Sequence, residues 1–316
     1  MAATPSDPQF ASIAQFVNYA YDISANSTPG GPIPLLPPGF PTDYALVAFI
    51  QATDDFWGYQ YPAYYGFIVY SAAKKHVVVA IRGTWFIMEW LIDLDAPMVK
   101  FIPKIGNDSG IVHAGLVEEG FNSVYTTLSF VDLNNQPVDL LAYLKRVTGD
   151  PAVTVDFVAH SLGGAITALL AASVGYFLPA VKPVSTVTTF AAPAAGDEKF
   201  RSFYEQFAPL TYRIWNGLDP VPSALWFAGY SQVPEPGIGI TPTWEEMLEY
   251  DSASVVCNHS LMTYQWLLDH SWPLASDCLP WTLGAAAKPN TVIQQQAAAA
   301  KAREEMKPGA VLHRVG

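Results

Sequence analysis

The chain has 316 residues, of which 51% are hydrophobic, and its formal net charge is −12. This acidic balance argues against binding to nucleic acid, whose phosphates would repel the surface, and against electrostatic docking on anionic membranes. No run approaches the roughly 18 consecutive apolar residues that a membrane-spanning helix needs. The composition therefore indicates a globular protein with a large core.

Regular elements are expected early in the chain. Residues 9–26 carry apolar side chains at helical spacing, which predicts a helix lying on the domain. Residues 27–41 are too rich in Pro and Gly for regular structure, so we expect a surface loop. Residues 64–71 and 76–82 are β-branched and aromatic runs separated by four residues, which predicts adjacent strands.

Further elements are expected after residue 100. The middle of 110–130 is predicted to be helical, and 184–191 and 210–215 are predicted to be strands. Residues 260–270 have an apolar helical face that stops near Pro273. Strands that alternate with helices indicate an α/β sheet with helices on its faces.

The domain organisation follows from the same pattern. No Pro/Gly/Ser-rich linker separates two self-sufficient cores, which favours a single domain over 1–284. Residues 285–316 form a polar, Ala-rich tail, predicted to be a peripheral helix or disordered.

The stretch 153–165 predicts a buried strand, a sharp turn and a helix, with Ser161 at the turn. Ala159 and Gly163 stand two residues to either side, where strand and helix backbones approach each other closely. This is the pattern of a nucleophile elbow, which exposes a serine hydroxyl at the top of a sheet. Ser161 is therefore the candidate nucleophile.

A serine hydroxyl needs a base, and in this architecture the chain order is serine, acid, histidine. His259 and His270 follow the serine, and His259 is favoured because a loop at the start of a helix could present it above the sheet. His270 is interpreted as a cap on the helix carbonyls. The other four histidines are disfavoured by position: His76, His113, His160 (interpreted as a packing residue) and His313.

The orienting acid is expected between the serine and the histidine, just after a strand. Asp219 follows the predicted strand 210–215 on a loop stiffened by Pro220 and Pro222. Asp251 lies in an acidic stretch, and Asp197 begins a predicted helix, which makes both weaker candidates. Asp219 is therefore preferred over a purely turn-forming role.

An oxyanion hole completes such a site. The backbone N–H of Leu162, which follows the serine, is one expected donor. The second is expected after an early strand, where Gly83 permits a close backbone approach and Thr84 can present its N–H.

Two cysteines, Cys257 and Cys278, bracket His259. Two are too few for a metal cage, so no metal is expected. A disulfide, which would favour an oxidising compartment, and two buried thiols are both compatible with the sequence. The first residues lack the basic start and apolar core of a secretory signal, so the chain is expected to be intracellular or a mature secreted form.

Taken together, these residues resemble the class 3 (fungal-type) lipases. The resemblance rests on seven blocks in order, at 77–84, 89–95, 112–125, 155–165, 188–197, 213–222 and 258–267. It implies an α/β-hydrolase fold, with a central, mostly parallel sheet and helices on both faces. It also implies Ser161, Asp219 and His259 as the triad, with Thr84 and Leu162 as the oxyanion hole. The chain departs from the family pattern at Ala159, where Gly is usual, and at Ala194, where the family often has a basic residue.

In this family, the segment after the oxyanion residue forms a lid. Here that segment, 85–94, is unusually apolar for a short surface element, and Trp85, Phe86, Trp90 and Leu91 are its expected substrate-facing residues. Exposed, they would form an apolar patch suited to a lipid–water interface. The alternative is that part of the segment is permanent core.

The function expected from the resemblance is hydrolysis of triacylglycerol without a cofactor. A feruloyl esterase or a phospholipase A1 is the alternative within the fold. A catalytically inactive binding module is the alternative of another class. Secretion is the favoured location, and the sequence leaves the oligomeric state open.

Overall fold

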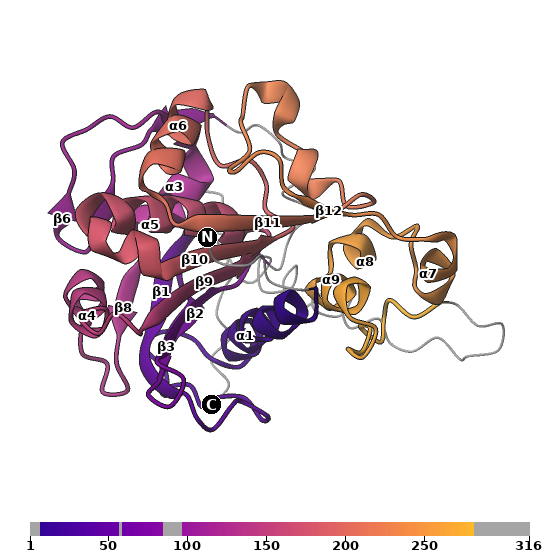
Figure 1. Ribbon diagram of the computed structural model, residues 1–316, viewed down its shortest axis with the longest axis horizontal. Helices are drawn as coiled ribbons and strands as arrows, with labels where there is room; N and C mark the ends of the chain where they lie inside the picture. The colour runs from indigo at the N-terminus through magenta and orange to yellow at the C-terminus, as the bar shows by residue number, and fades with distance from the viewer. Residues whose placement is uncertain (1–6, 57–58, 85–96, 281–316) are drawn as a thin grey trace, which may run out of the picture.

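A single large β-sheet organises the computed structural model, which describes residues 7–56, 59–84 and 97–280. Within these residues the sheet has eight strands, in the order β12-β11-β10-β9-β3-β2-β1-β8 (Figure 1). The strands are β1 (Ala45–Phe56), β2 (Tyr59–Ser71), β3 (His76–Ile81), β8 (Ser129–Val131), β9 (Thr154–His160), β10 (Ser185–Phe190), β11 (Leu210–Asn216) and β12 (Ile238–Ile240).

The strands β3 and β9 to β12 run parallel, whereas β2, β1 and β8 continue the sheet in antiparallel pairing. The prediction of a mostly parallel sheet is therefore confirmed. Parallel strands end at the same edge of a sheet, and in α/β proteins the functional groups gather at that edge. The segments that follow β3, β9 and β11 carry Thr84, Ser161 and Asp219, so the topology delivers all three to one edge.

Helices cover both faces of the sheet, as predicted. On one face lie α1 (Asp7–Asn26) and α9 (Leu261–Leu268), which contact each other. On the other lie α3 (Glu119–Thr126), α5 (Leu162–Phe177) and α6 (Glu198–Phe207), with α4 (Leu140–Val147) nearby (Figure 1).

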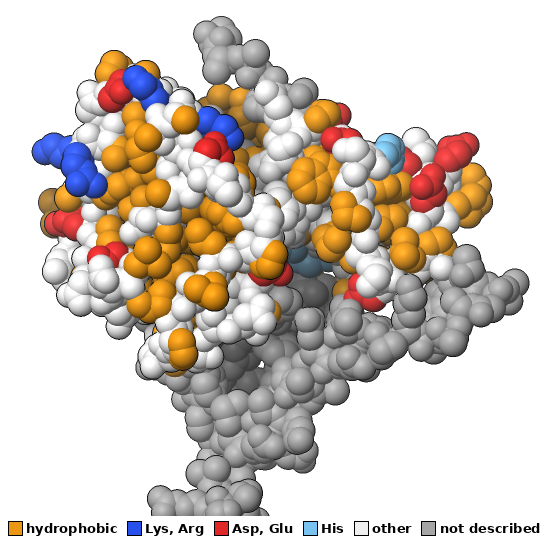
Figure 2. All heavy atoms as spheres, turned by 90° about the horizontal axis from the view of Figure 1, so that it is seen from below, with side chains coloured by type: hydrophobic (Ala, Val, Ile, Leu, Met, Phe, Trp, Pro, Cys, Tyr) orange, Lys and Arg blue, Asp and Glu red, His pale blue; other side chains and the backbone are white. Residues whose placement is uncertain are grey.

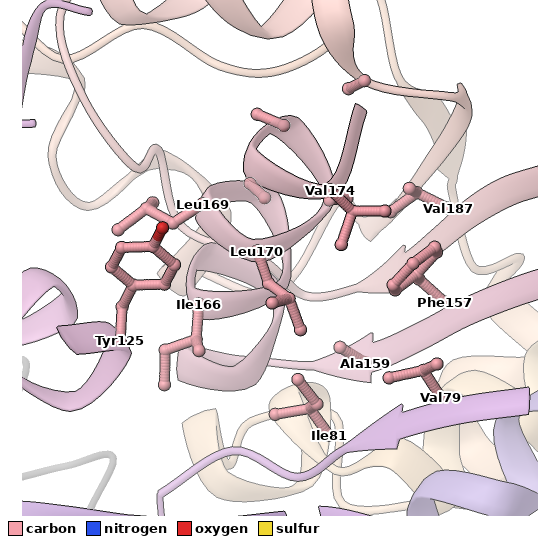
Figure 3. Packing of buried hydrophobic residues seen from close by; sticks show 14 of the residues in the cluster. Val79, Ile81, Tyr125, Phe157, Ala159, Ile166, Leu169, Leu170, Val174 and Val187 are labelled. Atoms are coloured by element: carbon pink, nitrogen blue, oxygen red, sulfur yellow. The ribbon is translucent and has the colours of Figure 1, made fainter. Parts of the chain in front are cut away.

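The alternation of side chains along β3 explains why both faces are covered. Val77, Val79 and Ile81 enter the core under α5, while Val78 and Ala80 enter the core under α1. A strand that is apolar on both sides must be buried on both sides. Figure 3 shows the first of these cores, in which Ile166 and Leu170 of α5 face the sheet residues.

A small C-terminal lobe contains α7 (Trp244–Glu249) and α8 (Val255–His259) next to α9. Its own apolar cluster includes Tyr250 and Trp266. A disulfide joins Cys257 to Cys278, with the two Cα atoms 5.4 Å apart. The disulfide, which the sequence left as one of two readings, is thus present.

Shorter elements complete the described part of the chain. They are the paired strands β4 (Met98–Lys100) and β7 (Leu116–Glu118), the paired strands β5 (Lys104–Ile105) and β6 (Asp108–Ser109), and the 3₁₀ helices η1 (Pro179–Val184), η2 (Val221–Ser223) and η3 (Trp226–Ala228).

The predicted elements are mostly found, but the structure has further elements that were not predicted, among them α4, α7, β8 and β12. The helix expected over 260–270 is Leu261–Leu268, and the short helix α8 precedes it. The long strand β1 was not predicted. The expected helix 9–26, the irregular loop 27–41 and the strand pair β2–β3 are all confirmed.

Two expectations fall outside the described residues: the lid over 85–94, with Trp85, Phe86, Trp90 and Leu91, and the tail 285–316. Within the described part, no helix is long and apolar enough to cross a bilayer.

Candidate active site

Ser161 stands between β9 and α5 in a backbone conformation that few residues adopt, with φ of 56° and ψ of −133°. Such a conformation costs on the order of 1–3 kcal/mol and persists only where its surroundings hold it. Here the Ser161 N–H donates to the carbonyl of Phe190 at 2.9 Å, on the neighbouring strand. The turn is therefore fixed on the sheet side by a backbone hydrogen bond.

The small residues around Ser161 have a steric reason. A Cβ placed on Gly163 would lie 2.2 Å from the Arg82 carbonyl oxygen. Ala159 is fully buried in the core on the other side of the turn. Because Gly163 has no side chain, the helix α5 and the segment after β3 can approach each other in direct backbone contact.

The structure brings Ser161, His259 and Asp219 together, although 98 residues separate the first two. His259 Nε2 lies 2.8 Å from Ser161 Oγ, and His259 Nδ1 lies 2.8 Å from Asp219 Oδ2. All three residues are buried. The carboxylate of Asp219 can only accept at Nδ1, so that nitrogen carries the proton and Nε2 is left to accept the serine proton.

The location of His259 differs from the sequence expectation. It is the last residue of α8 and not part of a loop. Ser260 then serves as the cap between α8 and α9. A five-residue helix carries too little periodic signal to be distinguished from a loop in the sequence.

Asp219 is held by two further hydrogen bonds. Its Oδ1 accepts the Val221 N–H at 3.0 Å, within the loop that Pro220 stiffens. Its Oδ2 also accepts the Tyr264 hydroxyl at 2.8 Å, and that hydroxyl accepts the Asn216 N–H at 2.9 Å. Burial, together with the Asp219 charge, raises the pKa of Tyr264 well above its ordinary value, so the phenol stays a neutral donor.

Tyr264 is the supporting residue that sequence reasoning missed. It lies on α9, five residues after His259, among apolar residues that indicate only a core face. The signal that could have found it is chemical: a buried tyrosine hydroxyl needs a polar partner.

The backbone around His259 is anchored on several sides. Asn216 donates through its side-chain amide to the Asn258 carbonyl, and Asn258 in turn donates to the Ser252 carbonyl. Tyr250 donates to the side-chain oxygen of Asn258 at 2.9 Å. The disulfide at Cys257 lies two residues before His259. The short helix α8 is thus tied to β11 and to the C-terminal lobe.

Of the two predicted oxyanion residues, Leu162 follows Ser161 in sequence, and Thr84 follows Gly83, which packs against Ser161. Leu162 is the first residue of α5, where backbone N–H groups have no partner within the helix. Gly83 lies so close to Ser161 that a Cβ placed on it would be 2.6 Å from the serine Cβ, and Thr84 follows it directly. The Arg82 guanidinium, which donates to the carbonyls of Tyr64 and Gly83, stiffens this segment.

Comparison with known proteins finds a family model that matches the part of the chain around this site. The family model described as Lipase (class 3) matches residues 78–227, a span that contains Thr84, Ser161 and Asp219. Residues 78–227 of the chain are therefore similar to the class 3 lipase family. The α/β-hydrolase fold expected from the sequence is confirmed by solved lipase structures. A lipase from Rhizopus microsporus var. chinensis is 22% identical with a TM-score of 0.54, and the match covers 76% of each chain.

Two curated relatives of the chain are plant proteins. Phospholipase A1-II 4 of Oryza sativa subsp. japonica is 34% identical over 164 residues, which are 49% of this chain and 41% of that protein. Phospholipase A(1) DAD1, chloroplastic, of Arabidopsis thaliana is 31% identical over 150 residues, which are 47% of this chain and 33% of that protein. The match thus spans less than half the length of these two relatives.

The candidates that the sequence analysis disfavoured have other contacts in the structure. Asp197 caps α6 by accepting the Phe200 N–H. His76 lies between the Tyr44 hydroxyl and Asp156. His270 was interpreted as a helix cap, but the C-cap of α9 is Asp269, and His270 Nε2 lies 3.0 Å from a Glu246 carboxylate oxygen.

His113 is 3.3 Å from Lys199 Nζ, and the Asp251 N–H donates to the Cys278 carbonyl. His313 lies outside the described residues. Within the described part of the chain, no group of three or more His, Cys, Asp or Glu side chains is arranged to hold a metal ion.

Proposed function

We propose that the protein is a serine carboxylic ester hydrolase that acts on the acyl esters of lipids. The observation that carries the proposal is the continuous chain from Ser161 Oγ through His259 to Asp219, with 2.8 Å at each contact. A serine hydroxyl hydrogen-bonded to a base, whose other nitrogen is oriented by a buried acid, is the arrangement needed for nucleophilic acyl transfer.

In the proposed reaction, Ser161 Oγ attacks the ester carbonyl and His259 Nε2 takes the serine proton. The imidazolium that forms is stabilised by Asp219, while the N–H groups of Leu162 and Thr84 bind the developing oxyanion. His259 returns the proton to the departing alcohol, which leaves an acyl-enzyme on Ser161. Water, activated by the same imidazole, then releases the fatty acid and restores the serine.

Two lipid classes are candidates for the substrate. Triacylglycerol is the class that the sequence predicts from its apolar 85–94 segment, proposed as a lid over the site. The curated relatives, at 34% and 31% identity, carry the name phospholipase A1, which favours the acyl ester of a phospholipid. We therefore give the phospholipid first place.

The test compares hydrolysis of phosphatidylcholine, triolein, tributyrin and methyl ferulate, above and below the concentration at which each lipid forms an interface. Phosphatidylcholine should be cleaved fastest, and the Ser161→Ala variant should lose about 10⁴–10⁶ in kcat while it stays folded. A Ser161→Ala variant with the wild-type rate would refute the nucleophile. A wild-type protein that cleaves none of the four esters would instead favour the inactive binding module.

We also propose that the protein resides in an oxidising compartment, in keeping with secretion. The Cys257–Cys278 disulfide supports this, because such bonds persist where thiols are not kept reduced. Alkylation of freshly isolated protein without reductant should modify neither cysteine. Quantitative alkylation of both would contradict the proposal.

A further inference from the structure

His160, the residue before Ser161, takes part in a chain of three hydrogen bonds that the reaction above does not use. The Gly83 N–H donates to the Tyr21 hydroxyl at 2.9 Å. The same hydroxyl lies 2.8 Å from His160 Nδ1, and His160 Nε2 lies 2.8 Å from the His259 carbonyl oxygen. This chain of hydrogen bonds therefore begins at Gly83, next to the proposed oxyanion residue Thr84, and ends on the backbone of His259. Residues 83–84 are called the oxyanion segment below.

The chemistry of these atoms allows one arrangement of protons. A carbonyl oxygen only accepts, so His160 Nε2 must carry the hydrogen in its bond to His259. A neutral imidazole then accepts at Nδ1, which makes the Tyr21 hydroxyl the donor there. The oxygen of Tyr21 accepts the Gly83 N–H. Each member thus donates one hydrogen bond along a single direction, from Gly83 to His259.

The surroundings of His160 keep this arrangement in place. His160 is 4% exposed, and its ring centre lies 4.8 Å from that of His259. Burial first, and the nearby His259 charge second, hold the pKa of His160 well below its ordinary value. His160 therefore stays neutral when His259 takes up a proton, and the direction of the chain is preserved.

Gly83 packs tightly against the nucleophile and against both members of the hydrogen-bond chain. A Cβ on Gly83 would lie 2.6 Å from the Ser161 Cβ, 2.6 Å from the Tyr21 hydroxyl and 2.8 Å from the His160 carbonyl oxygen. Thr84, the proposed oxyanion residue, follows at once. A shift of the Tyr21 hydroxyl, or of the His160 backbone, would therefore disturb the segment that carries Thr84.

Tyr21 and His259 lie on opposite sides of the span that the family model matches. Tyr21 belongs to α1, which precedes the span 78–227 matched by the family model. His259 lies beyond the other end of that span. The chain of hydrogen bonds thus joins the N-terminal helix, the segment after β3 and the C-terminal lobe at one point.

We propose that Tyr21 and His160 are a positioning pair, which holds the oxyanion segment and the His259 backbone at a fixed separation across Ser161. The proposal rests on the proposed function, since it assigns the pair to the same site. Neither residue touches the reacting atoms.

Matched substitutions separate positioning from packing. In His160→Gln the side-chain amide can replace Nε2 as donor to the His259 carbonyl. In His160→Asn the amide reaches only the place of Nδ1, so the bond to His259 is lost. Because a displacement of about 1 Å can cost 10²-fold in rate, His160→Asn should lose about 10- to 100-fold in kcat, with KM within about twofold of wild type. His160→Gln should stay within about fivefold of the wild-type kcat.

A double variant tests whether the two residues act through one chain. Tyr21→Phe removes the acceptor for Gly83 and the donor to His160. Residues in one hydrogen-bond network show non-additive effects. The variant Tyr21→Phe/His160→Asn should therefore lose less activity than the product of the two single losses.

A spectroscopic measurement gives a readout that does not need a substrate. The proton on His259 Nδ1, bonded to Asp219, is followed by its downfield proton NMR resonance in wild type and in both His160 variants. We expect this resonance to shift or broaden in His160→Asn and to be retained in His160→Gln.

The outcomes are distinct. Wild-type kcat and an unchanged resonance in His160→Asn would overturn the positioning role, as would equal losses in His160→Asn and His160→Gln. A wild-type protein that hydrolyses no ester would instead refute the proposed function. In that case the resonance alone decides the positioning role.

Discussion

At the scale of single residues, the candidate site depends on groups that hold the acid and the base in place. Asp219 accepts three hydrogen bonds, from His259, Tyr264 and the Val221 N–H. Each bond restricts the carboxylate to one orientation, and that orientation fixes the imidazole tautomer. The hydroxyl of Tyr264 is therefore part of the support for His259.

Removing this hydroxyl gives the first prediction. Tyr264→Phe should lower the free energy of unfolding by about 1–3 kcal/mol, because the buried Asn216 N–H loses its acceptor. It should also lower kcat by about tenfold, because Asp219 is less well held. Denaturant unfolding and steady-state hydrolysis measure the two effects.

Tyr204→Phe is the matched control, because the buried Tyr204 hydroxyl is hydrogen-bonded to Thr211, whereas that of Tyr264 donates to Asp219. It should lose stability but keep the wild-type kcat. Equal loss of kcat in Tyr264→Phe and Tyr204→Phe would contradict the support role of Tyr264.

His160 makes the stability depend on pH. Its pKa is lowered in the folded state, by burial and by His259, from an ordinary value of 6.5. Below pH 6.5, His160 binds a proton in the unfolded chain but stays neutral in the folded chain. The free energy of unfolding therefore falls as the pH falls toward the folded pKa of His160. Above pH 6.5 this contribution is fully present.

The variant His160→Gln cannot titrate at this position. Between pH 6.5 and about 5, its free energy of unfolding should therefore fall less steeply with falling pH than that of wild type. The two slopes should differ by about 1.4 kcal/mol per pH unit. Denaturant unfolding at several pH values measures the difference. Parallel curves for the two proteins would mean that His160 takes up a proton without unfolding.

At the scale of elements, α8 carries His259 and is too short to be stable alone. The disulfide at Cys257 closes a loop of 21 residues to Cys278 and ties this helix to the lobe. Loop closure of this length is worth about 3 kcal/mol. The double variant Cys257→Ser/Cys278→Ser should therefore lose about 2–4 kcal/mol of unfolding free energy.

The loss is measured by denaturant unfolding of the double variant and of wild type, the latter with and without reductant. Reductant should lower the midpoint of wild type and leave that of the double variant unchanged. A midpoint of wild type that is insensitive to reduction would contradict a stabilising role for the bond.

The elements also show how far the sequence could go. The strong periodic signals of α1, β3 and β10 were sufficient to predict them, and the elbow at Ser161 was visible as a pattern of small residues. The strand β1, which pairs with β2 and β8, was not predicted because its sequence lacks a clean alternation of apolar and polar residues. The role of Tyr264 was missed because its hydrogen bonds join segments that are distant in sequence. The short helix α8 was missed because five residues carry too little periodic signal.

At the scale of the whole molecule, charge sets the lipid surfaces that the protein can approach. The net charge of the chain is −12. On the face shown in Figure 2, hydrophobic side chains are widespread, and Lys and Arg lie only toward one side. Attraction to an interface would then depend on apolar contact, and an anionic surface would repel the molecule.

Binding to vesicles should follow this balance. At low ionic strength the protein should bind phosphatidylglycerol vesicles more weakly than phosphatidylcholine vesicles. Added salt should reduce the difference, because the screening length falls to about 8 Å at 0.15 M. Sedimentation with vesicles measures the bound fraction. Tighter binding to phosphatidylglycerol at low salt would contradict this account.

The central claim is that Ser161, activated by His259 and Asp219, is the nucleophile. The most direct measurement is the mass of the intact protein after reaction with a fluorophosphonate, followed by peptide mapping. We expect one adduct, on Ser161, with none in the Ser161→Ala variant and slow labelling in His259→Ala. An unlabelled wild-type protein, or a label on another residue, would contradict the account.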